Sequence, residues 1–475
     1  MYELLHLIIS FSSRSPSSSS TSSLSSWNEK LNTEKYTAKD NIAANVRFLN
    51  LQEHFSQTIL NDHNITTPKF KVAKSVKEAE QVAKDLLTKN LVVKAQVVTG
   101  GRGLGVFENG FQGGVHTAIS PCEAKELAGK MIGNHLITKQ TKQNGLICNS
   151  VMIAERKFSR REFYFAFALD REHNGPVLIA SSKGGVNIEE VAARSPEAVI
   201  YEPIDITKGF TKEIATWILK RVGITDQPGP ACKMLCNLYN LFVKKDALLA
   251  EINPYVEDVC MNYYPLDVKI TFDDNARFRQ REIFEKFDET QGDPKEIAAS
   301  KLDMAYVSLD GSIGCLVNGA GLAMATADIL DYHGGSPANF LDVGSMATAE
   351  HVRHAMNIIM MDEKVRTIFV NIFGGMMNCV AVTEGLLKAV RELDIKIPIV
   401  LRLQGNNHEA AKKIVKDANT NILAYEEFDE ATEMAVRCSR IMKLADDGNL
   451  NVAITMKSIC ECEPAPIKGE VVTQK

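Results

Sequence analysis

Three oxygen-bearing side chains near the middle of the chain could hold a metal ion or orient a reacting group. Glu251 and Asn253 stand two residues apart in an apolar stretch, and Asp267 lies in a second such stretch. Alternation along a strand would place Glu251 and Asn253 on one face, and strand pairing would bring Asp267 opposite Asn253. An amide oxygen and a carboxylate suit magnesium on a nucleotide, which usually takes one or two protein groups. A cross-strand polar pair without metal is the alternative, and spacing alone slightly favours it.

A basic, glycine-rich segment lies earlier in the chain. Lys94 stands in the apolar run 91–98, and Gly101-Arg102-Gly103 follows that run. Glycines let backbone N–H groups approach phosphate oxygens closely, and Arg102 would add positive charge. The sequence contains no G-x-x-x-x-G-K-[ST] motif, so a Walker A loop is excluded. A flexible surface hairpin is an equally good interpretation of the loop, and Lys94 could equally face water at a sheet edge.

Small and polar residues follow four short apolar stretches in the second half of the chain. If these stretches are parallel strands, the four loops meet at the carboxyl edge of one sheet, where doubly wound folds bind ligands. One loop imitates a dinucleotide fingerprint, but Met324 stands where the third glycine would be, which disfavours NAD binding. The loops are 318–321, 344–346, 374–377 and 405–407.

The elements that would position Lys94 and Glu251 form a mixed region over about 45–285. Apolar spacing predicts a helix over 75–89, and Ser120 caps a further helix with Pro121 in its first turn. Two pairs of apolar stretches predict antiparallel strands, which makes this region an α+β domain. The paired stretches are 163–169 with 176–181, and 247–256 with 265–272.

Strands and helices alternate strictly over 300–442. This alternation is typical of a doubly wound α/β domain of the flavodoxin-like kind, with a parallel sheet and helices on both faces. The predicted strands, each followed by a helix, are 314–317, 339–343, 367–372, 398–403 and 421–424.

The two ends differ from the rest of the chain. Residues 1–44 are rich in serine, with Arg14 and few acids. This composition favours a mitochondrial transit peptide, and hence the matrix, over a secretory signal. A short apolar stretch near the start would suit a secretory signal, but a basic start and a small-residue cleavage site are missing. Residues 443–475 show no clear period and predict a loose tail.

The overall composition excludes several classes of protein. The 475 residues carry a net charge of −5, which is too mild for a nucleic-acid surface. No apolar run reaches the roughly 18–20 residues that a membrane helix needs. The ten cysteines form no CxxC pair, which argues against a zinc ribbon and favours buried or free thiols.

Seven motifs, taken in order, closely resemble the β subunit of succinate–CoA ligase, also called succinyl-CoA synthetase. The resemblance covers about residues 45–440 and implies an ATP-grasp domain followed by a CoA-ligase domain. The motifs are VVKAQ (92–96), GGRG (100–103), GGVNIEEVA (184–192), EINP (251–254), LVNGAGLAM (316–324), NFLDVG (339–344) and NIFGG (371–375).

The resemblance implies an acid–thiol ligase that is active only with an α subunit. It would interconvert succinyl-CoA, ADP and phosphate with succinate, CoA and ATP, in the tricarboxylic acid cycle. The phosphorylated histidine and the CoA site would lie on the α subunit, so this chain would be half of an enzyme. The implied cofactor is Mg²⁺, with ATP or ADP as the nucleotide. No nucleic acid or membrane partner is expected.

The same resemblance assigns roles to single positions. Glu251 would be the catalytic residue that helps to orient the partner's phosphohistidine. The segment 155–162 looks like the ADP-forming branch rather than the GDP-forming one. The other assignments are Lys94, Gly101, Arg102, Gly103, Glu155 and Glu162 for the nucleotide, Asn253 and Asp267 for magnesium, and Asn318, Gly375, Met376 and Met377 for the substrates.

The chain departs from the family's pattern at several positions. Leu104 stands where a lysine is usual, and Ser345 and Met346 occupy positions where glycine is usual. Asn378 and Val380 replace two charged residues. The alternative is therefore a catalytically weakened paralogue that acts as a structural or regulatory partner of the α subunit. A ligase for another small carboxylate is a further alternative.

Overall fold

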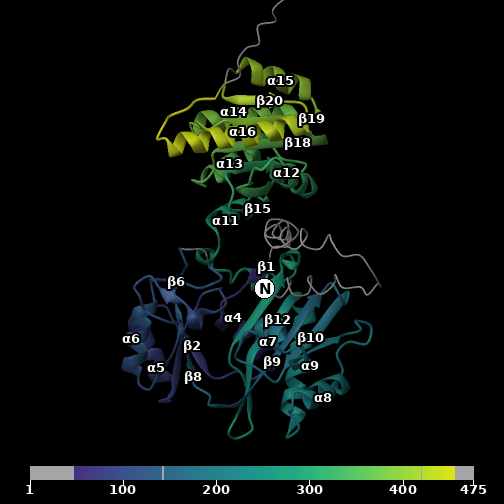
Figure 1. Cartoon of the computed structure of the whole chain (residues 1–475). Helices are drawn as coiled ribbons and strands as arrows, with labels where there is room; N and C mark the ends of the chain where they lie inside the picture. Colours follow the sequence, from purple (N-terminus) through teal and green to yellow (C-terminus); the bar gives the residue numbers. More distant parts are fainter. Residues whose placement is uncertain (1–47, 142–143, 419, 455–475) are drawn as a thin grey trace, which may run out of the picture. The chain divides into compact units, whose positions relative to one another are not determined.

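The structure is a computed structural model that describes residues 48–141, 144–418 and 420–454 (Figure 1). It divides into an N-terminal unit up to Gly292 and a C-terminal unit from Asp293 onward. The predicted transit peptide and most of the predicted tail lie outside the described residues. Within these described ranges, no helix is long and apolar enough to cross a membrane.

The largest sheet of the N-terminal unit is antiparallel throughout. Its strands in spatial order are β1 (Phe48–Asn50), β14 (Val268–Asp273), β12 (Ala247–Asp258), β9 (Ser159–Asp170), β10 (Gly175–Ser181) and β11 (Val199–Pro203), with β13 (Tyr263–Pro265) beside β12. Both predicted strand pairs are present, because β9 pairs with β10 and β12 pairs with β14.

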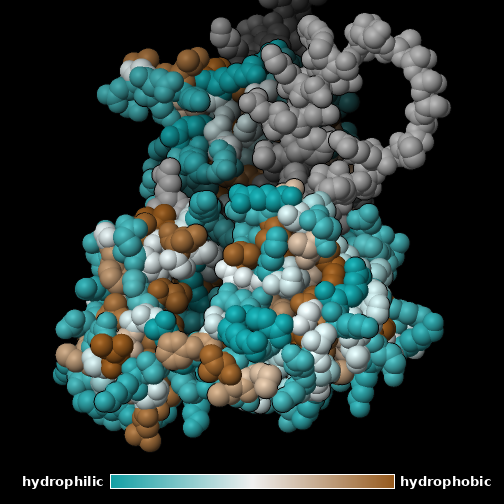
Figure 2. Space-filling model, turned by 60° about the horizontal axis from the view of Figure 1, so that its bottom comes forward, coloured by the Kyte–Doolittle hydropathy of each residue, from teal (hydrophilic) through white to brown (hydrophobic). Residues whose placement is uncertain are grey.

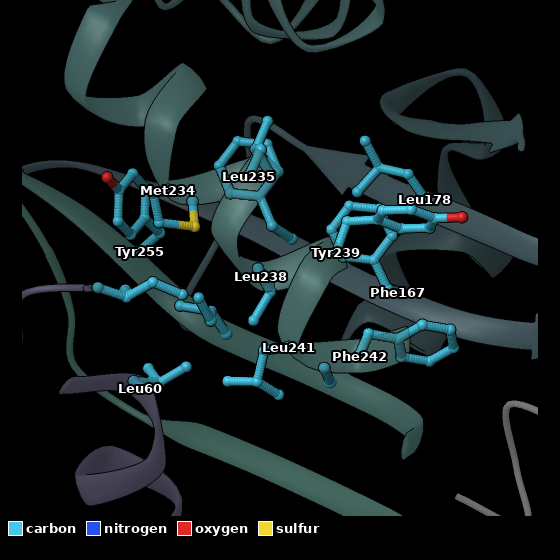
Figure 3. Close-up of a cluster of buried hydrophobic side chains, with 14 of the residues drawn as sticks. Leu60, Phe167, Leu178, Met234, Leu235, Leu238, Tyr239, Leu241, Phe242 and Tyr255 are labelled. Carbon is cyan, nitrogen blue, oxygen red and sulfur yellow. The ribbon is translucent and has the colours of Figure 1, made fainter. Parts of the chain in front are cut away.

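Two helices, α8 (Lys212–Arg221) and α9 (Pro228–Lys244), cover one face of this sheet. Figure 3 shows Phe167 of β9 against Tyr239 and Phe242 of α9, with ring centroids 5.4 and 6.2 Å apart. Burying a large apolar side chain stabilises a fold by about 1.5–3 kcal/mol, so this cluster fixes the sheet on its helices.

The opposite face of the same sheet carries the polar residues singled out above. Tyr164 and Ala166 of β9 point to this face and pack with Leu249 of β12 and with helix α7 (Ile188–Arg194). Glu251 lies two residues beyond Leu249 and therefore faces the same way.

Two smaller sheets complete the N-terminal unit. The first has the order β2 (Phe70–Ala73), β8 (Val151–Glu155), β3 (Leu91–Ala95), β5 (Val115–Ala118), and the second β4 (Val106–Phe107), β6 (His135–Ile137), β7 (Leu146–Ile147). The remaining α-helices of this unit are α4 (Glu53–Asp62), α5 (Val76–Asp85), α6 (Pro121–Met131) and α10 (Arg281–Phe284). Ser120 caps α6 as predicted, with its side chain accepting from the Glu123 N–H.

Strand β3 is an interior strand, since it pairs with both β5 and β8. The interpretation of Lys94 as an edge residue facing water is therefore wrong, and its side chain is buried. The strand ends at Ala95, three residues before the end of the apolar run 91–98.

The C-terminal unit has one sheet in the order β15 (Ala305–Ser308), β17 (Asn339–Asp342), β16 (Ile313–Val317), β18 (Thr367–Asn378), β19 (Ile399–Asn406), β20 (Ile422–Tyr425). Its helices are α11 (Pro294–Ser300), α12 (Ala320–Tyr332), α13 (Ala349–Met360), α14 (Cys379–Glu392), α15 (His408–Asp417) and α16 (Phe428–Asp447). Helices pack on both faces, as predicted. Strand β15 was not predicted, and it runs antiparallel at the edge, so the sheet is not purely parallel.

Exposed apolar side chains are scattered over the N-terminal unit. Ile206, Val259 and Phe278 are 74%, 76% and 68% exposed. On the face shown in Figure 2, hydrophobic residues lie in small groups between hydrophilic ones. Such scattered residues are normal on a globular surface and define no docking site.

Candidate active site

Four charged side chains from distant parts of the N-terminal unit form one ionic cluster. The Lys94 ammonium donates to Glu53 Oε1 at 2.8 Å and to the Leu266 carbonyl at 2.6 Å. The Arg102 guanidinium contacts the other Glu53 oxygen and donates to Asp267 Oδ1 at 2.9 Å. Glu53 is 3% exposed at its side chain, so this carboxylate binds both cations away from water.

The charges in this cluster balance, with two carboxylates against two cations. The surrounding protein disfavours the ionised form of Asp267, but the neighbouring Arg102 and Lys94 hold its pKa below the usual value. Burial likewise opposes the charge on Arg102, and the carboxylates of Asp267 and Glu53 raise its pKa above the usual value. Asp267 and Arg102 are therefore both charged at neutral pH, and the contacts of Arg102 with two carboxylates compensate the burial of its guanidinium.

The glycine-rich loop is pinned by its arginine. Arg102 donates to the Ala95 carbonyl at 3.1 Å, and its own carbonyl accepts from the Gly114 N–H at 2.8 Å. The interpretation as a flexible surface hairpin is therefore not supported. A Cβ at Gly101 or Gly103 would meet no atom within 4 Å, and Gly101 has a left-handed φ of +69°. The loop thus presents bare backbone to open space, which suits a phosphate group.

Asn253 and Asp267 are neighbours, as strand pairing predicted. The Asn253 N–H donates to the Asp267 carbonyl at 3.0 Å. The Asn253 side chain is oriented by the next turn, since its Oδ1 accepts from the Gly185 N–H at 2.8 Å and its Nδ2 donates to the Val186 carbonyl at 3.0 Å. Its oxygen and the Asp267 carboxylate therefore lie on one side of the sheet.

These two oxygen donors fit a magnesium ion that arrives on a nucleotide. The Asn253 oxygen accepts from the Gly185 N–H and the Asp267 carboxylate accepts from Arg102, and both keep further lone pairs. Among the described residues, no group of three His, Cys, Asp or Glu side chains could form a metal cage. A pair of oxygen ligands completed by phosphate and water is the arrangement that magnesium uses most often with nucleotides.

Glu251 lies beside this pair on the same face. It stands directly opposite Lys269 on β14 and Ala166 on β9. Burial raises the pKa of Glu251, Lys269 opposes that shift, and Glu189 adds to it. Burial and Glu251 also raise the pKa of Tyr164 well above its usual value. Glu251 is thus set in an environment in which an approaching cation would be bound favourably.

The two other acidic positions lie on consecutive strands of different sheets, Glu155 at the end of β8 and Glu162 near the start of β9. Glu162 accepts from the Ser159 hydroxyl at 2.7 Å, and a Cβ at Gly185 would collide with its carboxylate. Glu162 therefore borders the same turn that holds Asn253. Glu155 instead pairs with Lys157 at 2.8 Å.

In the C-terminal unit, the loops at the carboxyl edge contact one another. Asn318 Nδ2 donates to the Phe373 carbonyl and its Oδ1 accepts from the Phe373 N–H, both at 2.9 Å. Asp342 Oδ1 accepts from the N–H groups of Gly319 at 2.6 Å and Gly344 at 2.7 Å. Gly374 also pairs with Gly405 across β18 and β19, so the structure joins all four predicted loops at this edge.

The side chains after Gly374 point in different directions. Met376 is 71% exposed, whereas Met377 is 2% exposed and packs in the core of the sheet. Only the backbone of Met377 is therefore available at this edge. Asn378 accepts from the Val380 N–H at 3.0 Å and caps α14, so this departure from the family pattern has a local structural role.

Sequence reasoning missed Glu53 and Lys269. Glu53 lies in the first turn of α4, where an acidic residue is ordinarily explained by the helix dipole. Its partner Lys94 is 41 residues away, so no local spacing indicates the pair. The alternation over the predicted strand 265–272, which places Asp267, also places Lys269, so the sequence did carry a signal for Lys269.

Comparison with known proteins agrees with this architecture. Residues 50–257 match the ATP-grasp domain family and residues 316–436 match the CoA-ligase family. The structure of ATP citrate lyase from Methanothrix soehngenii covers 82% of this chain and 100% of its own, at a TM-score of 0.62 and 17% identity, which is a likeness of fold. The chain is therefore an ATP-grasp protein with a CoA-ligase domain, and the predicted fold class is confirmed.

Curated relatives narrow the class to one family. The mitochondrial succinate–CoA ligase [ADP-forming] β subunit of Columba livia is 49% identical over 407 residues, 86% of this chain and 98% of that protein. The same-named protein of Caenorhabditis elegans is 49% identical, covering 88% of this chain and 96% of its own. The mitochondrial succinate–CoA ligase [GDP-forming] β subunit of Dictyostelium discoideum is 45% identical, covering 83% of this chain and 94% of that protein. The chain belongs to the family of succinate–CoA ligase β subunits.

Proposed function

We propose that this chain is the β subunit of an ADP-forming succinate–CoA ligase. With an α subunit it interconverts succinyl-CoA, ADP and phosphate with succinate, CoA and ATP, which is acid–thiol ligase chemistry. The observation that carries the proposal is the 49% identity to an ADP-forming β subunit over 98% of that protein's length. The ionic cluster, the open glycine loop and the oriented oxygen pair support it.

The nucleotide would bind on the N-terminal unit. Lys94 and the segment Gly101-Arg102-Gly103 would hold the phosphates, and Glu155 and Glu162 would contact the rest of the nucleotide. Phosphoryl transfer needs positioning and charge neutralisation rather than covalent chemistry from such a subunit. The buried cations and the bare loop backbone supply both.

Magnesium would be held by Asn253 and Asp267, whose backbones are joined by the bond from the Asn253 N–H to the Asp267 carbonyl. When bound, the ion would neutralise charge on the nucleotide phosphates. Glu251 would help to orient the α subunit's phosphorylated histidine, since a carboxylate next to an imidazole fixes its direction and stabilises its cation.

The substrate edge would lie on the C-terminal unit. Asn318, Gly375 and Met376 stand at the carboxyl ends of parallel strands, where ligands bind in doubly wound folds. Met377 would contribute its backbone there, because its side chain is buried.

The place of action would be the mitochondrial matrix, since the relatives from Columba livia and Caenorhabditis elegans are mitochondrial proteins. Residues 1–44 would act as the transit peptide, 45–285 as the ATP-grasp domain and 300–442 as the ligase domain, with a tail over 443–475. Partners would be the α subunit and the small-molecule substrates, without nucleic acid or membrane.

An active ligase is favoured over the catalytically weakened paralogue, because the proposed nucleotide-binding, metal-binding and catalytic side chains of the N-terminal unit are intact. Among them are Lys94, Glu251, Asn253 and Asp267. The choice of carboxylate is tested with the chain co-expressed with a matching α subunit. Succinate, malate and acetate are offered in turn with CoA, ATP and magnesium. We expect acyl-CoA formation with succinate alone, whereas faster reaction with malate or acetate would overturn the substrate assignment.

A further inference from the structure

One cation on the polar face of the large sheet is not used by the ionic cluster. Lys94 and Arg102 are paired with Glu53 and Asp267. The side chain of Lys269 makes no hydrogen bond, and no ion pair within 4.0 Å, with any residue that the structure describes. Its ammonium group is therefore available to an incoming anion.

The strand register directs Lys269 to the site. Its neighbours Val268 and Ile270 are 4% and 0% exposed and pack in the core beneath α8 and α9. Alternation turns Lys269 to the opposite face, where it stands across from Glu251 and two residues after Asp267. Side chains of directly opposed residues start about 4.5–5.5 Å apart, so Lys269 and Glu251 share one small region of the face.

The groups around Glu251 are mostly negative, so a phosphoryl group that binds there needs a nearby cation. Glu251 stands directly opposite Lys269 in the strand register, and Asp267 lies two residues before Lys269, so two carboxylates border this region. A phosphoryl group placed beside Glu251 would bring further negative charge. Because the ionic cluster is already neutral, Lys269 is the described side chain on this strand pair that can offset that charge.

We propose that the ammonium of Lys269 binds the phosphoryl group in transit between the nucleotide and the partner's histidine. The inference rests on the proposed function. In the transfer, an imidazole nitrogen forms a bond to phosphorus while the bond from phosphorus to the bridging oxygen breaks, and the electron pair leaves with ADP. Lys269 forms and breaks no bond in this step and contributes charge alone, so it is a catalytic residue by contact with the transferred group.

The test uses the full chain assembled with its α subunit and compares Lys269→Met, Lys269→Arg and the control Lys220→Met. Lys220 is an exposed lysine of α8, the helix that covers the other face of the sheet, so the control removes the same charge without touching the site. Two quantities are measured: the rate at which ATP phosphorylates the α subunit's histidine, and the calorimetric affinities for ADP and for the imido analogue of ATP, both with magnesium.

We expect Lys269→Met to slow phosphorylation about a hundredfold, the usual effect of removing one charge-stabilising donor. Its affinity for the imido analogue should fall about tenfold while its affinity for ADP changes less than threefold, because ADP lacks the terminal phosphoryl group. Lys269→Arg should recover at least a tenth of the wild-type rate, and Lys220→Met should match the wild type.

Three results would overturn the inference. One is phosphorylation by Lys269→Met within threefold of the wild type. Another is an equal loss of ADP and analogue affinity, which would make Lys269 a general nucleotide-binding or structural residue. The third is an arginine variant that folds and is as slow as the methionine variant. A wild-type complex that never phosphorylates its histidine would instead overturn the proposed function, so the two failures are distinguishable.

Discussion

Replacing Glu53 with glutamine tests the ionic cluster most sharply. Glutamine keeps the shape of the side chain but removes the charge that Lys94 and Arg102 share. Their side chains are 11% and 8% exposed, so neither can regain water without rearrangement. Removing one partner from a buried ion pair costs about 3–5 kcal/mol. Domains are stable by about 5–15 kcal/mol in total, so this single change should remove a large share of the stability of the N-terminal unit.

The free energy of unfolding can be followed for the N-terminal unit by itself. Trp217 lies on α8 in this unit, and with Trp27 replaced by phenylalanine it is the single tryptophan left in the chain. Urea unfolding monitored by its fluorescence should show a much lower midpoint for Glu53→Gln than for the parent.

A surface glutamate with the same number of partners provides the control. Glu80 accepts from Lys84 at 2.7 Å and from Lys125 at 2.8 Å, but at a solvent-exposed site. Exposed ion pairs contribute little to stability, so Glu80→Gln should leave the midpoint nearly unchanged. Equal urea midpoints for Glu53→Gln and Glu80→Gln would refute the claim that burial makes the Glu53 cluster contribute more to stability than an exposed one.

Three further predictions follow from other contacts. Asp267→Ala should abolish the magnesium dependence of ADP binding in calorimetry, and unchanged magnesium-ADP affinity would contradict the metal assignment. Gly185→Ala should destabilise the N-terminal unit by at least about 1–2 kcal/mol in urea, the cost of a left-handed backbone, with additional loss from collision with Glu162. Gly110→Ala is the control, because Gly110 has a similar φ of +84° and a Cβ there would meet no atom within 4 Å. An equal loss of stability in this control would show that the collision with Glu162 contributes nothing. Asp362→Asn should cost about 1.5–3 kcal/mol at pH 7, because Asp362 binds Lys295 at 2.7 Å in the C-terminal unit. Burial would raise the pKa of Asp362, but Lys295 holds it below the unfolded value, so the contribution is full above about pH 4 and is lost as pH falls further. If the urea midpoints of Asp362→Asn and the parent differ by the same amount at pH 7 and pH 3, this pH dependence is wrong.

The strand pairing around the site could be predicted because it depends on local pattern. Alternation in the stretches around Asn253 and Asp267 fixes which side chains share a face, and a one-residue slip would bury the polar set. The observed bond between the Asn253 N–H and the Asp267 carbonyl follows from that register.

The environment of Lys94 could not be predicted in the same way. Whether a strand is interior or at an edge depends on neighbours that come from elsewhere in the chain. Lys94 is buried because β5 and β8 flank its strand and because Glu53 meets it from α4. No pattern in the sequence around Lys94 predicts either contact.

The C-terminal unit shows the same division. The strand-helix alternation predicted its sheet and both helix layers, since hydrophobic periodicity is a local signal. Strand β15 was not predicted, because it is only four residues long and its antiparallel pairing with β17 lies outside the strand-helix repeat. The burial of Met377 next to the exposed Met376 also depends on how β18 bulges against β19.

The central claim is tested most directly by turnover of the assembled enzyme. The chain is co-expressed with a matching α subunit, and succinyl-CoA formation from succinate and CoA is followed with magnesium and ATP, then with GTP. We predict turnover with ATP well above that with GTP. A stable complex that forms no succinyl-CoA with either nucleotide would contradict the ligase assignment and would make a structural or regulatory role the better account.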